Sequence, residues 1–462
     1  MRSLLRRRGA LVVVVALLGA SALVVVACGF DVVSSGGPLP VTTVDAGPET
    51  GAALPEGGSV TDAADAEVAD SGQYPCDAAA CVEEIAADYT HTCAVIRGAR
   101  PRCWGANSDG QLGSGLTPEG GVDLAPSASP RLVAVTVPMT GITVGGVPVA
   151  GYAYSCAHTA GGDVTCWGQD DLGQRGRPDG GTVVLSVPTP VSMIGDALDV
   201  QAGGGHVCAL HGDGGLSCWG YDDFGQLGRI AASTIDRMPA PVTLRAAVKR
   251  VTTGDSHTCA LMADDAVDCW GTDGAGQLGR GGAAASSAHA TPVTVTGVAG
   301  AIDVAAGYVH TCAVLKGGSV MCWGYDSNGQ LGRGTPTAGG FSTSAAPVAL
   351  PAGTTATAVC AGYFYSCALS SDGTVMCWGA NESGQLGSGV VTGGVVAPSQ
   401  SATPLAVTGV TGARAITCGA HHTCAIVENS QAVCWGANDS GQLGAGLPPD
   451  TLPRPTPVRV AF

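Results

Sequence analysis

Short runs of strand-forming residues on either side of a turn recur seven times along this chain. In residues 312–322, Val314 and Val320 flank the turn-forming pair Gly317-Gly318, and the other six copies have Gly, Asp or Asn at the same midpoint. Outside the first 27 residues, no long stretch carries apolar residues at the i, i+3, i+4 and i+7 positions of an amphipathic helix. The pattern therefore predicts seven β-hairpins in an all-β chain.

Each predicted hairpin has a cysteine at either end, and a Trp-Gly pair begins directly after the second cysteine. These tryptophans are the only ones in the sequence, and neighbouring ones lie 51 to 63 residues apart. They are Trp104, Trp167, Trp219, Trp270, Trp323, Trp378 and Trp435. A period in the fifties that is repeated seven times indicates a repeat architecture.

The first 27 residues differ from the repeats. Four arginines precede an almost wholly apolar run over residues 10–27, which is typical of an export signal. The run ends at Val25-Val26-Ala27-Cys28, which resembles a bacterial lipobox. We therefore predict a lipoprotein signal peptide over residues 1–27 and a lipid on Cys28. A plain transmembrane anchor is the alternative, because 18 apolar residues are nearly enough to span a membrane.

Residues 28–75 form the second predicted segment. They contain eight acidic residues and no basic ones, and Gly, Pro, Ser, Thr and Ala are frequent, so we expect a disordered tether. The repeats then occupy a single folded domain over residues 76–462. We expect an exported protein that a lipid anchors to the cell envelope, at the outer membrane or cell surface, and that touches the membrane only through this lipid.

Symmetry about the turn places the two cysteines of each hairpin opposite each other. Their Cβ atoms are then about 4.5–5.5 Å apart, near the distance that a disulfide spans. A zinc site and free thiols are the alternatives, but the closely spaced C-x2-C pairs of zinc sites are absent, and 14 free thiols would be hazardous in an exported chain. The predicted disulfides are Cys93–Cys103, Cys156–Cys166, Cys208–Cys218, Cys259–Cys269, Cys312–Cys322, Cys367–Cys377 and Cys424–Cys434.

The same symmetry places a ring opposite the glycine of each Trp-Gly pair. This ring is a tyrosine in two repeats and a histidine in the others, namely His91, His206, His257, His310 and His422. The histidines could line a channel as metal ligands, but tyrosine at two equivalent positions favours a structural role. No metal or other cofactor is predicted. The acidic residues after Trp-Gly lack the full pattern of a calcium loop and are interpreted as turn residues.

Residues 310–332 read HTCAVLKGGSVMCWGYDSNGQLG, and the other copies follow the same line. This phrase resembles the repeat of the regulator of chromosome condensation family, and the resemblance covers about 380 of the 462 residues. It implies a seven-bladed β-propeller with four-stranded antiparallel blades around a central channel. We expect the C-terminal strand, around residues 455–460, to close the ring by completing the blade that Val82–Ala87 begins.

Other features narrow the function classes. The formal net charge of −16, without a basic stripe, argues against nucleic-acid binding. The family's best-known activity is guanine-nucleotide exchange on a nuclear GTPase, and neither the export signal nor the acidic sequence supports it here. No hydrolase elbow, zinc-protease motif or phosphate loop occurs, so no catalytic residue is predicted.

Aromatic residues four positions before the first cysteine are the candidate binding residues. We expect them at a turn, from which side chains project on one face of the disc, where aromatic anchors are typical of interfaces. They are Tyr89, Tyr152, Tyr308 and Tyr363, joined by Phe364. Local packing over the turn is the alternative. In the other repeats the position holds Gly204, Asp255 or Ala420.

Two further cysteine pairs are candidates for disulfides. Cys360 and Cys418 lie shortly before the first cysteine of the last two repeats, where a disulfide between blades is an open alternative. Cys76 and Cys81 are expected to form a small clasp where the tether meets the ring.

These observations favour a monomeric binding scaffold that recognises a protein or glycan through one propeller face. Specificity would lie in the variable loops at residues 114–130, 333–345 and 388–400. The alternative is an enzyme that acts on extracellular or cell-wall polysaccharide in the central channel. Carboxylates or histidines that converge at the channel mouth with shifted pKa values would favour this enzyme.

Overall fold

The computed structural model describes residues 81–147, 152–178, 185–230, 233–392 and 395–462. The chain divides into two units, residues 1–63 and 64–462, and every described residue belongs to the second. The predicted signal peptide, the lipidation of Cys28 and the tether fall on residues outside the described part. Cys81 is described and is in a disulfide, but its expected partner Cys76 lies outside the described part. Within that part, no helix combines the length and the apolar composition needed to cross a membrane.

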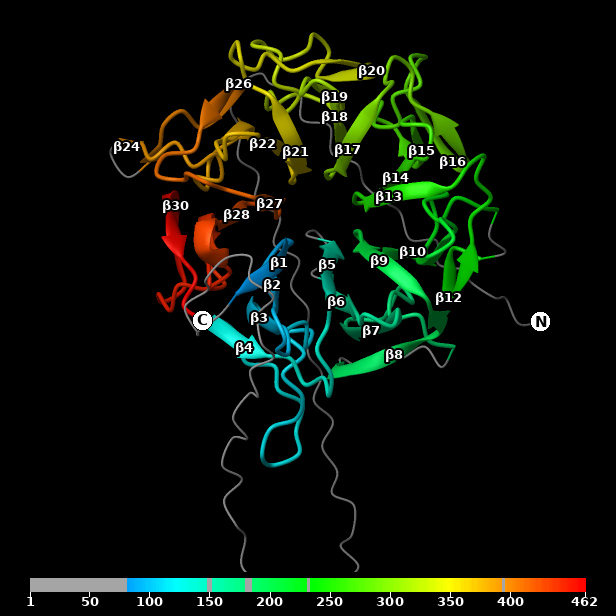
Figure 1. Cartoon of the computed structure of the whole chain (residues 1–462), viewed down its shortest axis with the longest axis vertical. Coiled ribbons are helices and arrows are strands. Elements are labelled where there is room, and N and C mark those ends of the chain that lie inside the picture. Colours follow the sequence, from blue (N-terminus) through cyan, green and yellow to red (C-terminus); the bar gives the residue numbers. More distant parts are fainter. Residues whose placement is uncertain (1–80, 148–151, 179–184, 231–232, 393–394) are drawn as a thin grey trace, which may run out of the picture. The chain divides into compact units, whose positions relative to one another are not determined.

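Seven four-stranded antiparallel sheets form the blades of a β-propeller, as the repeat predicts (Figure 1). The first blade contains β1 (Val82–Ala87), β2 (His91–Ile96), β3 (Arg102–Gly105) and β4 (Ser127–Leu132); the second contains β5 (Gly141–Val147), β6 (Tyr152–His158), β7 (Asp163–Gly168) and β8 (Leu185–Gly195); and the third contains β9 (Ala197–Ala202), β10 (His206–His211), β11 (Leu216–Tyr221) and β12 (Ile235–Pro241). The fourth blade contains β13 (Val248–Thr253), β14 (His257–Met262), β15 (Val267–Asp273) and β16 (Ala285–Thr294), and the fifth contains β17 (Ala301–Ala306), β18 (His310–Leu315), β19 (Val320–Tyr325) and β20 (Phe341–Pro347). The sixth blade contains β21 (Ala356–Ala361), β22 (Tyr365–Ser370), β23 (Val375–Ala380) and β26 (Gln400–Ala406), and the seventh contains β27 (Ala415–Cys418), β28 (His422–Val427), β29 (Gln431–Asn438) and β30 (Asp450–Arg459). A small hairpin, β24 (Val391–Thr392) and β25 (Val395–Val396), and a 3-10 turn, η1 (Glu428–Ser430), complete the elements. The first strand of each blade lies nearest the centre (Figure 1).

The hairpin register agrees with the symmetry argument. In the fifth blade, Cys312 pairs with Cys322, Thr311 with Trp323, and His310 with Gly324. All seven predicted hairpin disulfides are formed, with Cα atoms 4.0–4.1 Å apart. Each disulfide lies on the sheet face opposite its neighbouring tryptophan because successive side chains of a strand point to opposite faces.

The hydrophobic core lies between neighbouring blades. The Cys93–Cys103 disulfide of the first blade packs in one buried cluster with Trp167 of the second. The indole Nε1 of Trp167 donates to the carbonyl oxygen of Gln111 at 2.8 Å. A Cβ on Gly113 would lie 2.6 Å from that indole, so only glycine fits there. These contacts explain the repeated Gly-Gln-Leu-Gly motif, which receives the tryptophan of the next blade.

The closure of the ring differs from the prediction in one respect. The C-terminal strand β30 pairs with β29 and completes the seventh blade, whereas the blade begun by Val82–Ala87 contains its own fourth strand, β4. The predicted exchange of a strand between the two ends is therefore wrong, because residues 127–132 already occupy the outer place in the first blade. The ends meet by packing instead, with Phe462 edge-on to Trp104 at 5.7 Å between ring centroids.

The recurrent histidines connect neighbouring blades. The Nε2 atom of His257 lies 3.0 Å from the hydroxyl of Thr311 in the next blade, and His422 closes the ring through Thr92 at 2.8 Å. In the second blade, the Tyr154 hydroxyl replaces the histidine and donates to the Gly203 carbonyl oxygen. These side chains are fully buried between blades, which supports the structural interpretation over a channel-lining metal ring.

Acidification is expected to lower the melting temperature between about pH 6.5 and pH 4. Burial lowers the pKa of His91, His206, His257 and His422 to about 3 and that of His310 to about 4. Unfolded histidines bind protons near pH 6.5, so this contribution to stability is full above that pH and is lost as pH falls. Calorimetric scans from pH 7.5 to pH 4 measure the effect.

Carboxyls whose pKa values are raised act in the opposite direction, and besides Glu84 and Asp88 they are Asp109, Asp222, Asp255 and Asp303. Burial raises the pKa of Glu84 to about 8 and that of Asp88 to about 7, so they favour the folded state most below about pH 4 and less as pH rises. Five histidines should outweigh them. A melting temperature that stays constant or rises from pH 6.5 to pH 4 would show that the histidines are not held neutral.

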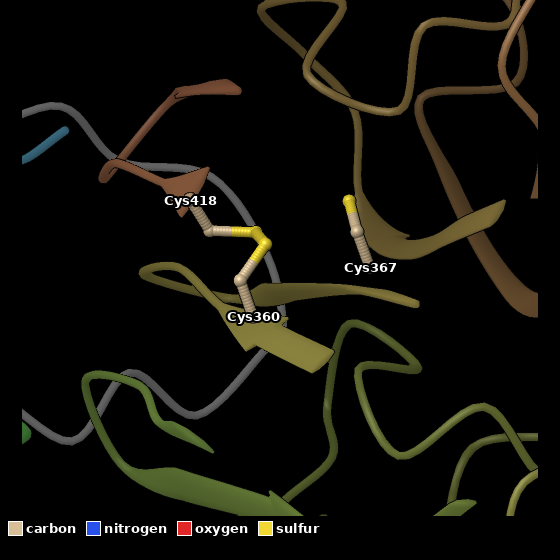
Figure 2. A group of neighbouring side chains, drawn as sticks. All are labelled: Cys360, Cys367 and Cys418. Carbon is tan, nitrogen blue, oxygen red and sulfur yellow. A yellow bond between two sulfur atoms is a disulfide. The ribbon is translucent and has the colours of Figure 1, made fainter. Parts of the chain in front are cut away.

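The disulfide between Cys360 and Cys418 joins the innermost strands β21 and β27 of the last two blades (Figure 2). This resolves the alternative that the sequence left open. The sulfur of Cys367 lies within 4.8 Å of the sulfurs of Cys360 and Cys418. Because Cys367 is itself bonded to Cys377, these sulfurs form two neighbouring disulfides. Unlike the fully buried hairpin disulfides, Cys360 and Cys418 line the central channel.

Candidate functional site at the channel mouth

A ring of close backbone contacts constricts one end of the channel. In six blades the residue after the innermost strand, or late within it, is a glycine, and a Cβ there would lie 2.4–2.6 Å from a carbonyl oxygen of the next blade. The glycine ring consists of Gly145, Gly203, Gly254, Gly307, Gly362 and Gly419. In the first blade this position is Asp88, and a Cβ on Gly419 would lie 2.5 Å from the Asp88 carbonyl oxygen. The ring thus presents one carboxyl side chain at the mouth.

An arc of aromatic rings borders this mouth. Tyr308 and Tyr363 lie 4.0 Å apart between ring centroids, and Phe364 lies 4.3 Å from Tyr363. His421 lies 5.6 Å from Tyr363 and 6.0 Å from Tyr89, which carries the series into the first blade. With Tyr325, 5.5 Å from Phe364, these six residues are called the aromatic arc. All six are partly exposed.

The structure brings together four of the five aromatic residues that the sequence singled out. Tyr89, Tyr308 and Tyr363 lie in the turn between the first two strands, as expected. The expected turn position is wrong for Tyr152, because this residue belongs to β6 and pairs with Val147. The innermost strand β5 of the second blade runs past the level of the ring, so Tyr152 becomes part of the sheet. No ring contact within the described residues joins it to the arc.

Two carboxyl groups line the small cavity of about 110 Å³ at the mouth, together with Tyr308 and Tyr363. Burial, together with the neighbouring charge of Asp255, raises the pKa of Asp88 to about 7. Burial also raises the pKa of Asp255, although the Ser256 hydroxyl donates to its Oδ2 at 2.8 Å. One oxygen of each carboxyl, Asp88 Oδ2 and Asp255 Oδ1, is buried without a hydrogen-bond partner.

Sequence reasoning missed the carboxyls and His421. Asp88 stands where the other copies have glycine, as in Ala306-Gly307-Tyr308 against Ala87-Asp88-Tyr89, and this exchange was the available signal. Asp255 was noted only as a replacement for tyrosine. Nothing in the local pattern around His421 relates it to Tyr89, which lies 332 residues earlier in the sequence.

A second cavity of about 290 Å³ occupies the channel beyond the mouth. Burial, together with the charge of Asp199, raises the pKa of Glu84 there to about 8. Arg250 Nε lies 3.2 Å from Asp303 Oδ1, so part of the lining charge is neutralised. The lining of this second cavity is therefore polar, and the positive charge of Arg250 is already paired with Asp303.

The variable loops leave the blades at the same end as the aromatic arc. Adjacent strands are antiparallel, so the connections between strands one and two and those between strands three and four emerge together. The three predicted specificity loops are connections of the second kind. They carry exposed apolar side chains, including Leu116, Phe341 and Val390, at 58%, 40% and 48% exposure. We call this end of the propeller the arc end.

Turn chemistry accounts for the acidic residues after each Trp-Gly. Asp222 Oδ1 accepts a hydrogen bond from the Leu227 backbone N–H at 2.8 Å, and Asp326 Oδ1 accepts one from Leu331 at 2.9 Å. Asn381 and Asn438 hold the same position in later blades. Because Asn serves as well as Asp, the interaction depends on the oxygen acceptor rather than on charge.

Known proteins with different functions are similar in sequence to this chain. The chain is 28% identical over 374 residues to the ultraviolet-B receptor UVR8 of Arabidopsis thaliana, which covers 78% of each sequence. It is 30% identical over 354 residues to the human E3 ubiquitin-protein ligase HERC2, which covers 74% of this chain and 7% of that one. The matched region is thus a small part of the ligase.

Solved structures share the fold. Prp20p of Saccharomyces cerevisiae superposes with a TM-score of 0.66 at 20% identity, covering 83% of this chain and 88% of that one. Human WBSCR16 gives a TM-score of 0.64 at 20% identity, with coverage of 78% and 93%. The sequence profile of the RCC1-like domain matches residues 182–461, which is more than half of the chain. Together with the seven blades and their repeated Trp-Gly and Gly-Gln-Leu-Gly contacts, this match shows that the chain belongs to the RCC1-like domain family.

Proposed function

We propose that this chain is a binding scaffold of the cell envelope that recognises a protein partner through the arc end of the propeller. The lipid on Cys28 and the acidic tether would hold the propeller at the membrane surface. The main support for this proposal is that three features lie at the same end of the propeller. They are the aromatic arc, two carboxyls without full hydrogen bonding and the exposed loop residues.

Several features support recognition over catalysis. Clustered, partly exposed aromatic residues are typical anchors of protein interfaces. Two of the relatives are a receptor and a ubiquitin ligase by name, so the shared domain is not tied to one reaction. The opposite end of the blades carries the short hairpin turns, such as Gly317-Gly318, and the connections to the next blade.

Affinity capture from envelope and secreted fractions tests this proposal. The bait is oxidised protein over residues 76–462, beside a variant with Tyr89, Tyr308, Tyr363 and Phe364 changed to alanine. Replacement of four anchors is expected to abolish capture, because each contributes on the order of 1–2 kcal/mol or more. Quantitative mass spectrometry of the bound proteins measures the loss.

A matched control changes Leu198 and Ile302 to alanine. These residues are 64% and 44% exposed and lie at the beginning of innermost strands β9 and β17, at the opposite end. The control should capture the partner as well as the wild type does. Equal capture by all three baits, or loss only with the control, would contradict recognition by the arc end.

A second candidate is an enzyme that acts on extracellular polysaccharide. The convergence of Asp88 and Asp255 with raised pKa values favours it, since one protonated and one ionised carboxyl are what glycoside hydrolysis needs. The mouth cavity is small for a polymer chain, which is why we rank it second. Release of reducing sugars from wall polysaccharide that Asp255→Asn abolishes would establish the enzyme.

A further inference from the structure

The mouth cavity carries unbalanced negative charge. Asp88 and Asp255 line it, and its other lining residues include no lysine, arginine or histidine. The Ser256 hydroxyl donates to Asp255, yet Asp88 Oδ2 and Asp255 Oδ1 are each buried without a hydrogen-bond partner. A buried acceptor without a donor is costly, so a ligand with N–H donors and positive charge would stabilise this site.

Aromatic faces border the same cavity. Tyr308 and Tyr363 both line it, with their rings 4.0 Å apart between centroids and tilted by 33°. Aromatic rings attract cations through their quadrupole, and they also pack against the apolar methylene stem of a long side chain.

We propose that the mouth is a socket for one lysine or arginine side chain on a protruding loop of the protein partner. This inference rests on the scaffold function proposed above and specifies its chemistry. The cationic head would donate to Asp255 Oδ1 and Asp88 Oδ2, and its stem would lie against Tyr308 and Tyr363. The formal charge of −16 on the whole chain also favours a basic partner.

Two other occupants fit the site less well. A bound metal ion needs several ligand atoms close together, and within the described ranges the one such group of three is Cys360, Cys367 and Cys418, whose sulfurs are in disulfides. A neutral sugar could stack on the tyrosines and donate to the carboxyls, but it would leave the buried negative charge without compensation.

The socket should bind more tightly at higher pH. Because the pKa of Asp88 is raised to about 7 and that of Asp255 is also raised, both lose charge as pH falls. The groups that face them are the Tyr154, Tyr221, Tyr308 and Tyr363 hydroxyls, which stay protonated between pH 6 and 8 because burial raises their pKa values. Burial lowers the pKa of His421, at the edge of the arc, so it remains mainly neutral.

Calorimetric titration with short peptides tests the socket. The probes are acetyl-Gly-Lys-Gly-amide, its arginine analogue and a norleucine analogue, which keeps the stem but lacks the charge. For the lysine and arginine peptides we expect binding at least about ten-fold tighter than for norleucine at pH 8. The preference should shrink at pH 6. The titrated protein is the oxidised propeller over residues 76–462.

Two variants with the same change in net charge locate the effect. Asp255→Asn should weaken binding of the lysine peptide about ten-fold, while keeping the volume of the side chain. Asp213→Asn, in a hairpin turn at the opposite end, should leave binding unchanged. Equal binding of lysine and norleucine, an unaffected Asp255→Asn variant, or no binding of the lysine peptide at tens of millimolar would each overturn the socket.

The socket and the scaffold can fail separately. If the captured partner is lost with the four-aromatic variant but held equally well by Asp255→Asn, the socket is wrong and the scaffold stands. If capture never depends on the arc end, the scaffold itself fails. Tight binding of chitotetraose or cellotetraose without binding of the lysine peptide would overturn the socket in favour of the polysaccharide enzyme.

Discussion

Full reduction of the disulfides is expected to leave the chain unable to refold. Each hairpin disulfide closes a loop of eleven residues, which is worth about 2.5–3 kcal/mol in the chain-entropy model. Seven of them together contribute up to about 20 kcal/mol, more than the typical stability of 5–15 kcal/mol for a folded domain. The core lacks large aromatic side chains apart from one tryptophan per blade and two buried tyrosines, so it cannot replace that contribution.

Two measurements separate the accessibility of each disulfide to reductant from the contribution of the disulfides to the stability of the fold. Native protein in mild reductant should first lose the Cys360–Cys418 disulfide, which lines the channel, while the hairpin disulfides at 0% exposure persist. Alkylation and mass spectrometry identify the sites. Protein reduced in urea should regain native tryptophan fluorescence on dilution into an oxidising buffer but not into a reducing one. Recovery in the reducing buffer would show that packing alone stabilises the propeller.

Changing Gly254 to alanine is expected to destabilise the protein by about 3 kcal/mol or more. A Cβ there would lie 2.5 Å from the Gly307 carbonyl oxygen in the next blade and 2.3 Å from Cε1 of the buried His257 ring. Neither group can move without opening the glycine ring that shapes the channel mouth. Urea unfolding followed by tryptophan fluorescence measures the free energy of unfolding.

Gly274 provides the matched control in the same blade. Nothing lies within 4 Å of a Cβ built there, and its backbone is not in the left-handed region. Gly274→Ala should therefore change stability by less than about 0.5 kcal/mol. Similar stability of the two alanine variants would mean that the blades can separate slightly at the mouth, and the ring would then not be rigid.

The repeat made most of the fold predictable because its information is local. A symmetric hairpin fixes which residues face each other, so Cys312 and Cys322, or Thr311 and Trp323, could be paired from spacing alone. The exchange of the C-terminal strand could not be judged in this way. It depends on whether residues 127–132 fill the outer place in the first blade, and only the sheet order shows that they do.

The candidate site was less predictable because it forms only when the ring closes. Tyr308 and Tyr363 stand at equivalent positions in neighbouring blades, so symmetry brings them together. Asp88 and Asp255 come from the first and fourth blades and line the same cavity. Tyr152 was misplaced because a single longer strand, β5, carries it into the sheet. Repeat symmetry therefore predicts neighbours well, whereas exceptions to the repeat create the chemistry.

Hydrogen–deuterium exchange of the propeller with its captured partner tests recognition by the arc end most directly. The account predicts slower exchange at residues 88–90, 308–309 and 363–364 and in the loops that follow the third strands. The short hairpin turns at the opposite end, including Gly317-Gly318, should exchange at unchanged rates. Protection confined to those hairpin turns, with the arc end unaffected, would contradict the account.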